Sequence, residues 1–326
     1  MLDLKLIEEA KNFLQGKVRR TPIEYSPKLS TILGVDAFLK LENLQITGSF
    51  KIRGAFFRLS KIHKQQVRQG VATCSAGNHG KALAFAGKSL GIPVTVYVPK
   101  SVDQSKLEGI KSYGANVFVS DFSGYDETEI WARKQAATSQ MPFISAFDEP
   151  EIMAGNGGTL AEEILKDLPK VQNIVLPIGG GGLAAGLSFY AKAVSPQISL
   201  IGCQHELSPA LALSLQQKKA VTWLPAVETA AGGIEGGIGA ETFEIIKTRI
   251  SKICLLSEEE IFQGFRFSLQ YHQYLIEPSA AVVISSVLSG KLDKLSGPTL
   301  FVLSGRNASM ELIRQILCAK GPQLEF

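Results

Sequence analysis

Four consecutive glycines, Gly179, Gly180, Gly181 and Gly182, form the segment of the sequence with the strongest chemical implication. They follow the apolar run NIVLPI and precede a segment of helical periodicity that begins near Leu183. A glycine costs about 0.5–1 kcal/mol relative to alanine in ordered structure, so this backbone must meet a particular requirement. Unshielded N–H groups at the start of a helix bind phosphate, whereas a tight strand-to-helix turn rarely needs four glycines. The run therefore predicts a phosphate-binding loop.

The same loop is also compatible with a dinucleotide. Gly180, Gly182 and Ala185 fit the G-x-G-x-x-A form of a dinucleotide-binding fingerprint. The next expected strand ends at Gln204 instead of an acidic residue that would bind a ribose, which disfavours this interpretation. A non-catalytic nucleotide-binding protein is the alternative from a different functional class.

A second polar segment, SAGNHG at residues 75–80, lies between the apolar run VATC and the helix-like KALAFAG. Serine and asparagine often cap helices, so capping explains Ser75 and Asn78 as well as ligand binding does. Glycine N–H groups beside Ser75, Asn78 and His79 would also suit a carboxylate. No zinc site is expected, because ligand spacing is absent around the other histidines, His63, His205 and His272.

Two further polar turns follow apolar runs and contain Lys51, in TGSFKIRGA, and Ser304, in LSGRN. An isolated lysine is usually a solvated surface charge. A desolvated lysine amine becomes a nucleophile because its pKa falls, but burial is not visible in a sequence. Ser304 is either a helix cap or a hydroxyl presented at the end of a strand.

The elements that must position these segments alternate along the chain. Helix-length segments with a period near 3.6 residues separate short apolar, β-branched runs. This alternation predicts an α/β fold with a parallel sheet covered on both faces and with ligands at the carboxyl ends of the strands. The runs expected to form strands are residues 37–42, 71–73, 94–98, 116–119, 173–178, 199–202 and 299–304.

Several strand–helix units lie close together after the polar run KIHKQQVRQG. We therefore expect a small α/β domain, residues 67–148, inserted into a large domain made of residues 1–66 and 149–326. A chain of 326 residues exceeds the usual length of one domain, which supports this division.

The composition argues against several classes of function. The 34 basic and 30 acidic residues form no dense basic stripe, so nucleic acid is not an expected partner. The N-terminal segment lacks the features of a signal peptide, and no apolar run approaches the ~18 residues that span a bilayer. The four cysteines form no C-x-x-C pair. We expect a soluble cytoplasmic protein with no membrane partner.

In their order and spacing, GSFKIRGA, SAGNHG, GGGG and LSGRN resemble the pyridoxal-phosphate enzymes of the tryptophan-synthase-β fold type, specifically the threonine dehydratase and serine racemase family. VPKSVDQSKLEGIKSYGANV, GYDET, FDEPEIMAGNGGT and IEPSAAV fit between these motifs, so the resemblance covers nearly the whole chain. It implies fold type II, in which two open, mostly parallel α/β domains hold the cofactor between them. It also implies a homodimer.

The resemblance further assigns roles to individual residues. Lys51 would hold pyridoxal 5'-phosphate as a Schiff base and later remove the Cα proton, while Phe50 packs beside the ring. Asn78 would bond to the ring hydroxyl, and Ser304 would donate a hydrogen bond to the pyridine nitrogen. The remaining contacts are with the phosphate, assigned to Gly179, Gly180, Gly181 and Gly182, and with the substrate carboxylate, assigned to Ser75, Asn78 and His79.

These assignments imply elimination from a small amino acid. The cofactor is an electron sink for a Cα carbanion, and a serine at the pyridine nitrogen lets loss of a β-hydroxyl compete with transamination. Racemases of the family carry a second serine where this chain has Ala76, so dehydration is preferred over racemisation. We expect a dehydratase (ammonia-lyase) that converts L-threonine, L-serine or a related 3-hydroxy amino acid to a 2-oxo acid and ammonia. The alternatives are β-replacement, as in threonine synthase, and serine racemisation.

Several positions depart from the family pattern. Gln204 and Ala210 stand where some members hold a divalent cation with acids, and Glu206 alone would be a poor site, so no metal is expected. The usual Ala-Asp-Gly motif reads AGG at residues 231–233, and the segment AGNGGT at residues 154–159 is one residue longer than usual. These differences leave the identity of the hydroxy amino acid open.

Overall fold

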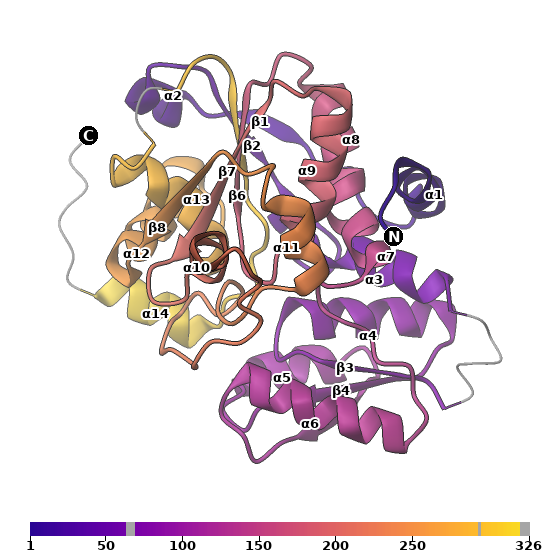
Figure 1. The fold of residues 1–326 in the computed structure, drawn as a ribbon. Helices are drawn as coiled ribbons and strands as arrows, with labels where there is room; N and C mark the ends of the chain where they lie inside the picture. The colour runs from indigo at the N-terminus through magenta and orange to yellow at the C-terminus, as the bar shows by residue number, and fades with distance from the viewer. Residues whose placement is uncertain (63–68, 293–294, 320–326) are drawn as a thin grey trace.

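The computed structural model describes residues 1–62, 69–292 and 295–319, and the strands in this part of the chain form two sheets (Figure 1). The larger sheet has six strands in the order β1-β2-β9-β6-β7-β8, and the smaller has three in the order β3-β4-β5. All pairings within these sheets are parallel except that of β1 with β2. The expected α/β fold with mostly parallel sheets is confirmed.

The larger sheet separates two hydrophobic cores. Ile174 and Leu176 contribute to one core, and Val175 between them contributes to the other, because successive side chains of a strand point to opposite faces. Its central strands are buried along their length, as continuous apolar runs require when both faces are covered. The strands are β1 (Ile23–Tyr25), β2 (Ala37–Lys40), β6 (Asn173–Pro177), β7 (Ser199–His205), β8 (Lys252–Leu256) and β9 (Thr299–Val302).

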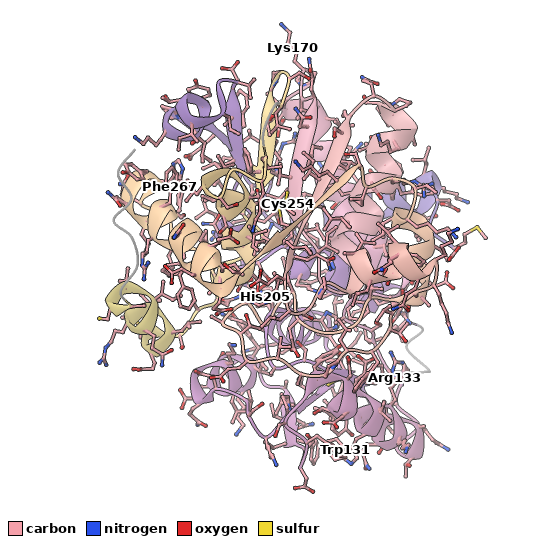
Figure 2. The ribbon with its side chains drawn as sticks, turned by 60° about the vertical axis from the view of Figure 1, so that its left-hand side comes forward. Trp131, Arg133, Lys170, His205, Cys254 and Phe267 are labelled. Atoms are coloured by element: carbon pink, nitrogen blue, oxygen red, sulfur yellow. The ribbon has the colours of Figure 1, made fainter. Side chains whose placement is uncertain are left out.

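Two groups of helices cover the faces of this sheet (Figure 1). On the Val175 side lie α2 (Pro27–Leu33), α12 (Glu258–Phe267), α13 (Pro278–Leu288) and α14 (Met310–Cys318). Figure 2 shows Phe267 at the end of α12, which continues into the π-helix η4 (Ser268–His272). The opposite side is covered by α1 (Leu4–Leu14), α3 (Lys51–Ser60), α7 (Pro150–Met153), α8 (Thr159–Asp167), α9 (Gly182–Val194), α10 (Ala210–Gln217) and α11 (Ala240–Ile246).

The smaller sheet has its own helices and a small core. Trp131 and Arg133, labelled in Figure 2, belong to one helix, α6 (Tyr125–Thr138). The ring of Tyr97 packs edge-on against Trp131 with the ring centroids 5.1 Å apart, and Arg133 lies over the ring of Phe143. The helix α3 of the larger body packs against α4 of the smaller one. The elements are β3 (Val71–Cys74), β4 (Val94–Val98), β5 (Asn116–Val119), α4 (Asn78–Leu90), α5 (Gln104–Lys111) and α6 (Tyr125–Thr138).

The segment AGNGGT, which we expected to be one residue longer than usual, forms a π-helix, η3 (Ala154–Gly158), between α7 and α8. One inserted residue widens a helical turn in this way. Within it, Oδ1 of Asn156 accepts a hydrogen bond from the N–H of Gly54 at 2.8 Å. A Cβ at Gly54 would lie 2.7 Å from the Asn156 side chain, so glycine permits this close contact with α3.

Each run expected to form a strand contains one, but the runs at residues 37–42 and 299–304 extend past their strands, and Glu42 begins the 3-10 helix η1 (Glu42–Leu44). The strands β1 and β8 were not predicted. Both lie at edges of the sheet and lack the continuous burial of its central strands. The predicted boundary between residues 66 and 67 lies outside the described residues, so the division into a large and an inserted domain stays a prediction. In the described ranges, no helix is both long and apolar enough to cross a membrane.

Candidate active site

A cavity of about 400 Å³ is lined by residues that follow β3, β4, β5, β6 and β9. This is the edge of a parallel sheet where ligands bind, and small-molecule sites generally occupy about 300–1,000 Å³. The structure brings together every residue predicted for the site. The predicted residues that line the cavity are Phe50, Lys51, Ser75, Asn78, His79, Gly179, Gly180, Gly181, Gly182 and Ser304.

Lys51 is the first residue of α3, and its side chain lies in the wall of the cavity. Its Nζ donates a hydrogen bond to the carbonyl oxygen of Ala146 at 2.8 Å and lies 5.4 Å from the centroid of the Phe50 ring. Burial lowers the pKa of Lys51 to about 8, although the charge of Glu277 opposes this shift. A substantial share of the amine is therefore neutral, and thus nucleophilic, near pH 8.

The loop before Lys51 is joined to the turn that follows β9. The N–H of Phe50 donates to the carbonyl oxygen of Ser304 at 3.1 Å, and the N–H of Arg306 donates to that of Gly48 at 2.8 Å. Ser49 and Gly305 form an antiparallel bridge between these two bonds. Lys51 and Ser304 are therefore held relative to each other by backbone hydrogen bonds.

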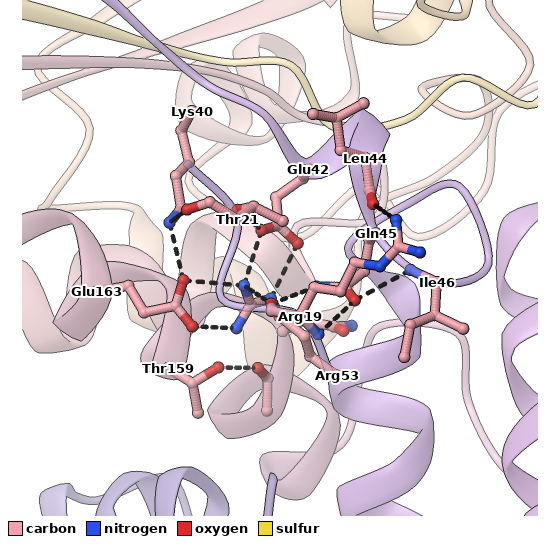
Figure 3. A network of polar contacts seen from close by, with 12 residues as sticks. Arg19, Thr21, Lys40, Glu42, Leu44, Gln45, Ile46, Arg53, Thr159 and Glu163 are labelled. Carbon is pink, nitrogen blue, oxygen red and sulfur yellow. Dashed lines mark hydrogen bonds and ion pairs between the residues drawn. The ribbon is translucent and has the colours of Figure 1, made fainter. Parts of the chain in front are cut away.

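A buried charge cluster anchors the first turn of α3 (Figure 3). The guanidinium of Arg53 donates two hydrogen bonds to Glu42 at 2.8 and 2.9 Å and two to Glu163 at 2.8 and 3.0 Å. Lys40 Nζ donates to Glu163 at 2.8 Å. Burial alone would raise the pKa of Glu163, but Arg53 and Lys40 outweigh it and hold this pKa below its ordinary value. The charges of Arg53 and Lys40 thus balance those of Glu42 and Glu163. Because Arg53 lies two residues after Lys51, this cluster fixes the start of α3.

Close packing explains all four glycines, since even at Gly179 a Cβ would lie 2.9 Å from the carbonyl oxygen of Gly233. Gly181 has a φ of +90° and precedes α9. A Cβ at Gly180 would lie 2.3 Å from the Phe147 ring, and one at Gly181 would lie 2.7 Å from Oγ1 of Thr242. At Gly182 a Cβ would lie 2.7 Å from the carbonyl oxygen of Phe147. No side chain fits at these positions, so backbone groups form this part of the cavity wall.

The backbone of this loop presents N–H groups and not carbonyls. The Gly180 carbonyl oxygen accepts hydrogen bonds from Oγ1 of Thr242 at 2.8 Å and from the N–H of Gly239 at 3.1 Å. In the described part of the chain, the N–H groups of Gly179, Gly180 and Gly181 donate no hydrogen bond. The first N–H groups of α9 also lack intrahelical acceptors. These donors suit an anion such as a phosphate.

His79 is buried in the cavity wall and is only 2% exposed. Neither ring nitrogen forms a hydrogen bond of ordinary distance and angle with a described residue, although the backbone of Ile144 lies near enough to oppose the lowering of the His79 pKa. Burial and the positive charge of Lys51 lower its pKa to about 3, so the imidazole is neutral at physiological pH. A buried polar group without a partner costs about 1–3 kcal/mol, which favours a ligand that satisfies it.

Two further residues of the site, Glu277 and Asn307, were missed by the sequence reasoning. Glu277 accepts from Nδ2 of Asn78 at 2.6 Å and from the N–H of Asn307 at 3.1 Å. Burial raises the pKa of Glu277, although its bond with Asn78 opposes this. The signals were present in IEPSAAV and LSGRN, where a glutamate and an asparagine stand among apolar and small residues.

Gln204 stands at the position where some members of the threonine dehydratase and serine racemase family bind a cation. In this protein its side chain forms two hydrogen bonds with the backbone. Its Nε2 donates to the carbonyl oxygen of Ile178 at 3.3 Å, and its Oε1 accepts from the N–H of Ala212 at 3.1 Å. Within the described ranges, no group of three or more His, Cys, Asp or Glu residues could hold a metal ion. His205, labelled below Cys254 in Figure 2, is hydrogen-bonded through Nε2 to the carboxylate of Glu258 at 2.9 Å.

A family model described as pyridoxal-phosphate dependent enzyme matches residues 14–305. The chain belongs to this family. It is 37% identical to an L-threonine ammonia-lyase of Geobacter sulfurreducens, over 97% of this chain and 78% of the relative. It is 35% identical to a catabolic L-threonine dehydratase of Staphylococcus aureus, over 95% of this chain and 90% of the relative.

Solved structures extend this comparison to the fold. Maize serine racemase superposes with a TM-score of 0.90 and 28% identity, covering 97% of each chain. The T.th. threonine deaminase superposes with a TM-score of 0.86 and 30% identity, covering 94% of this chain and 99% of that one. The expected family and fold type II are confirmed, and the protein is an enzyme whose cofactor is pyridoxal phosphate.

The cavity fits this cofactor on four observations. A buried amine, Lys51, is available for the cofactor's aldehyde, and the glycine loop offers N–H donors to a phosphate. The orphaned nitrogens of His79 supply polar groups that need a partner. The hydroxyl of Ser304, on a residue 3% exposed, likewise forms no hydrogen bond within the described part of the chain.

Proposed function

We propose that the protein is an ammonia-lyase that eliminates the β-hydroxyl of L-threonine, L-serine or a related 3-hydroxy amino acid, releasing a 2-oxo acid and ammonia. The observation that carries this proposal is the buried amine of Lys51, with its pKa near 8, in one cavity with the glycine loop and the SAGNHG segment. The similarity to relatives named for threonine dehydration supports the substrate class.

Lys51 would attach the cofactor, and Phe50 would pack beside its ring. The N–H groups of the glycine loop would bind the phosphate, Asn78 the ring oxygen, and Ser304 the pyridine nitrogen. When bound, pyridoxal phosphate withdraws electrons from Cα and so lets an amino acid lose its α-proton. The buried position of these donors supports the assignment, because fixed dipoles stabilise charge most strongly where water is excluded.

The substrate carboxylate would bind at Ser75, Asn78 and His79. Ser75 is buried, and its hydroxyl oxygen accepts a hydrogen bond from the N–H of Gly77 at 3.3 Å, so the hydroxyl hydrogen can still be donated to a ligand. The imidazole of His79 is neutral and can donate one hydrogen bond without adding charge. The main-chain N–H of Asn78, at the start of α4, has no intrahelical acceptor and can donate to the same carboxylate, which leaves the free side-chain amide hydrogen for the ring oxygen.

Lys51 would act as the base that removes the Cα proton. A lysine whose pKa lies near 8 is deprotonated far more readily at neutral pH than an ordinary one, which favours proton abstraction. Ala76, which also lines the cavity, has only a methyl side chain, so it supplies no second proton-transfer group. This difference favours elimination over racemisation.

The test is a panel of hydroxy amino acids incubated with the purified protein and pyridoxal phosphate, scored for 2-oxo acid and ammonia. L-threonine and L-serine should both yield equal amounts of the two products, and the Lys51→Ala variant should yield neither. Absence of ammonia with every member of the panel would refute the proposal. Formation of D-serine from L-serine as the main product would favour racemisation, the alternative that the similarity to maize serine racemase supports.

We also propose that the enzyme is a cytoplasmic homodimer with residues 67–148 as an inserted domain. The family resemblance supports the dimer, and the separate three-stranded sheet supports the domain division. Light scattering on the cofactor-loaded protein measures the oligomeric state directly. A monomeric mass at micromolar concentration would overturn the dimer.

A further inference from the structure

Four side chains form a continuous hydrogen-bond chain along one wall of the cavity. Nζ of Lys81 donates to Oδ1 of Asn307 at 2.9 Å, and Nδ2 of Asn307 donates to Oδ1 of Asn78 at 2.6 Å. Nδ2 of Asn78 in turn donates to Oε1 of Glu277 at 2.6 Å. Asn78, Asn307 and Glu277 line the cavity, whereas Lys81 lies behind them.

The direction of this chain is set by its two charged ends. An ammonium group can only donate, so Lys81 requires the carbonyl oxygen of Asn307. An ionised carboxylate can only accept, and both oxygens of Glu277 do so, one from Asn78 and one from the N–H of Asn307. The carbonyl oxygen of Thr47 accepts a second bond from Nδ2 of Asn307 at 2.9 Å.

Neither amide can therefore turn over without placing two donors or two acceptors against each other. A rotated Asn307 would present its oxygen to the Thr47 carbonyl and its nitrogen to Lys81. A rotated Asn78 would present its oxygen to Glu277. Each mismatch leaves buried polar groups unsatisfied, which is costly in a largely desolvated wall.

The chain also depends on glycines that allow its members to approach the backbone. Gly48 has a φ of +80°, and a Cβ there would lie 2.7 Å from Oδ1 of Asn307. A Cβ at Gly305 would lie 2.6 Å from Oε1 of Glu277. The turn that carries Asn307 is thus shaped to hold both side chains.

Nδ2 of Asn78 carries two hydrogens, and within the described residues it donates only to Glu277. We propose that Lys81, Asn307 and Glu277 are positioning residues that make Asn78 present an N–H donor, and not its carbonyl oxygen, to the cavity. The inference rests on the proposed binding of pyridoxal phosphate there, with Asn78 assigned to its ring oxygen. A donor stabilises an oxygen anion, whereas a carbonyl would repel it.

The first test exploits Lys81, which does not line the cavity. Lys81→Gln and Lys81→Met remove the same charge, but only glutamine can still donate to Asn307. The readouts are the Kd of the apo-protein for pyridoxal phosphate, from fluorescence quenching, and the wavelength of the visible absorption band. We expect Lys81→Gln to bind within about twofold of wild type and Lys81→Met about fivefold more weakly, the value of one hydrogen bond. Equal affinities in the two variants would show that Lys81 has no part in the hydrogen-bond chain.

The second test reverses the donor-to-acceptor direction of the hydrogen-bond chain at Asn78. Asn307→Asp replaces the donor facing Asn78 by an acceptor, and Glu277→Gln replaces one acceptor by a donor, so each single variant contains a mismatch. Together they restore complementary partners around an Asn78 amide that has turned over. We expect the apo-protein of the double variant to regain part of the melting temperature lost in the single variants, the remaining loss coming from the new carboxylate at position 307, which still faces the carbonyl oxygen of Thr47. Its Kd for pyridoxal phosphate should stay at least about tenfold above that of wild type.

Asn116→Asp, at an exposed position of β5 whose side chain forms no hydrogen bond within the described residues, makes the same chemical change away from the site and should alter neither quantity. If affinity recovers together with thermal stability, the chain is merely structural and the proposal fails. Melting-temperature losses that simply add in the double variant would also overturn it. Because no amino acid is present in these measurements, a wild type that binds the cofactor but releases no ammonia refutes the proposed function alone.

Discussion

Replacing Glu163 by glutamine removes one negative charge from a buried cluster in which two cations balance two carboxylates. Glu163 accepts three hydrogen bonds, two from Arg53 and one from Lys40. Glutamine keeps one acceptor oxygen, but its amide nitrogen would face a cation that can only donate. At least one buried donor then loses its partner, and the cluster acquires a net positive charge.

The expected cost follows from these losses. Each unsatisfied buried donor costs about 1–3 kcal/mol, and breaking a buried ion pair from one side costs about 3–5 kcal/mol. We therefore expect Glu163→Gln to lower the free energy of unfolding of the apo-protein by about 3–5 kcal/mol. Adding Lys40→Met removes the excess cation, so the double variant should lose clearly less than the sum of the two single losses.

Urea unfolding followed by circular dichroism measures these differences, with Glu311→Gln as the control. Glu311 pairs with Arg314 on an exposed face of α14, and losing that pair should cost less than about 0.5 kcal/mol. A loss for Glu163→Gln as small as that of the control, or strictly additive losses in the double variant, would refute the reasoning.

The pH dependence gives an independent check. Because the pKa of Glu163 is held below its ordinary value of 4.5 in the folded protein, its stabilising contribution is complete above that pH and is lost as the pH falls through the lower, folded-state value. The difference in stability between wild type and Glu163→Gln should therefore shrink on acidification below about pH 4.5. A difference that stays constant down to pH 3 would contradict the charge-based explanation.

Three further results are expected. The rate at which the apo-protein captures pyridoxal phosphate, followed by stopped-flow absorbance, should rise with pH and level off above about pH 8 as Lys51 loses its proton; a rise that continues to pH 10 would indicate an ordinary lysine. Gly180→Ala places a Cβ 2.3 Å from Phe147 and should lower the free energy of unfolding in urea by about 1–3 kcal/mol. Gly109→Ala is the control, because its Cβ would meet no atom within 4 Å, and it should be neutral or stabilising. If both variants destabilise the protein, the packing argument is wrong. Ala76→Ser supplies a hydroxyl in the cavity and should make D-serine detectable by chiral chromatography; a product mixture unchanged from wild type would remove Ala76 as the cause of the preference for elimination.

Most components of the cavity could be predicted from sequence because SAGNHG, GGGG and LSGRN closely follow strands, whereas Lys51 is separated from β2 by the 3-10 helix η1 (Glu42–Leu44). Lys51, Asn78, Gly180 and Ser304 lie far apart in the chain, but the carboxyl ends of parallel strands converge on one cavity. The burial of Lys51 and the orphaned nitrogens of His79 could not be predicted, since both depend on which side chains surround them in three dimensions.

The supporting charges were hidden for a related reason. Arg53 is paired with Glu163, a residue 110 positions away, and periodicity carries no information about such a pairing. Lys40 looks like an outward-facing residue at the end of a strand, yet it is fully buried. Edge strands such as β8 were missed because partial exposure interrupts the apolar pattern that identifies central strands.

The backbone pairing of Ser49 with Gly305 has a consequence for how such an enzyme can diversify. It makes the lysine and the serine parts of one body, built on the six-stranded sheet, whereas Asn78 and His79 follow β3 in the other sheet. Substitutions among residues 75–79 that spare Asn78 would therefore leave the spacing of lysine and serine unchanged. Asn78 itself is tied by hydrogen bonds to Glu277 and Asn307, so it connects the two sheets across the cavity.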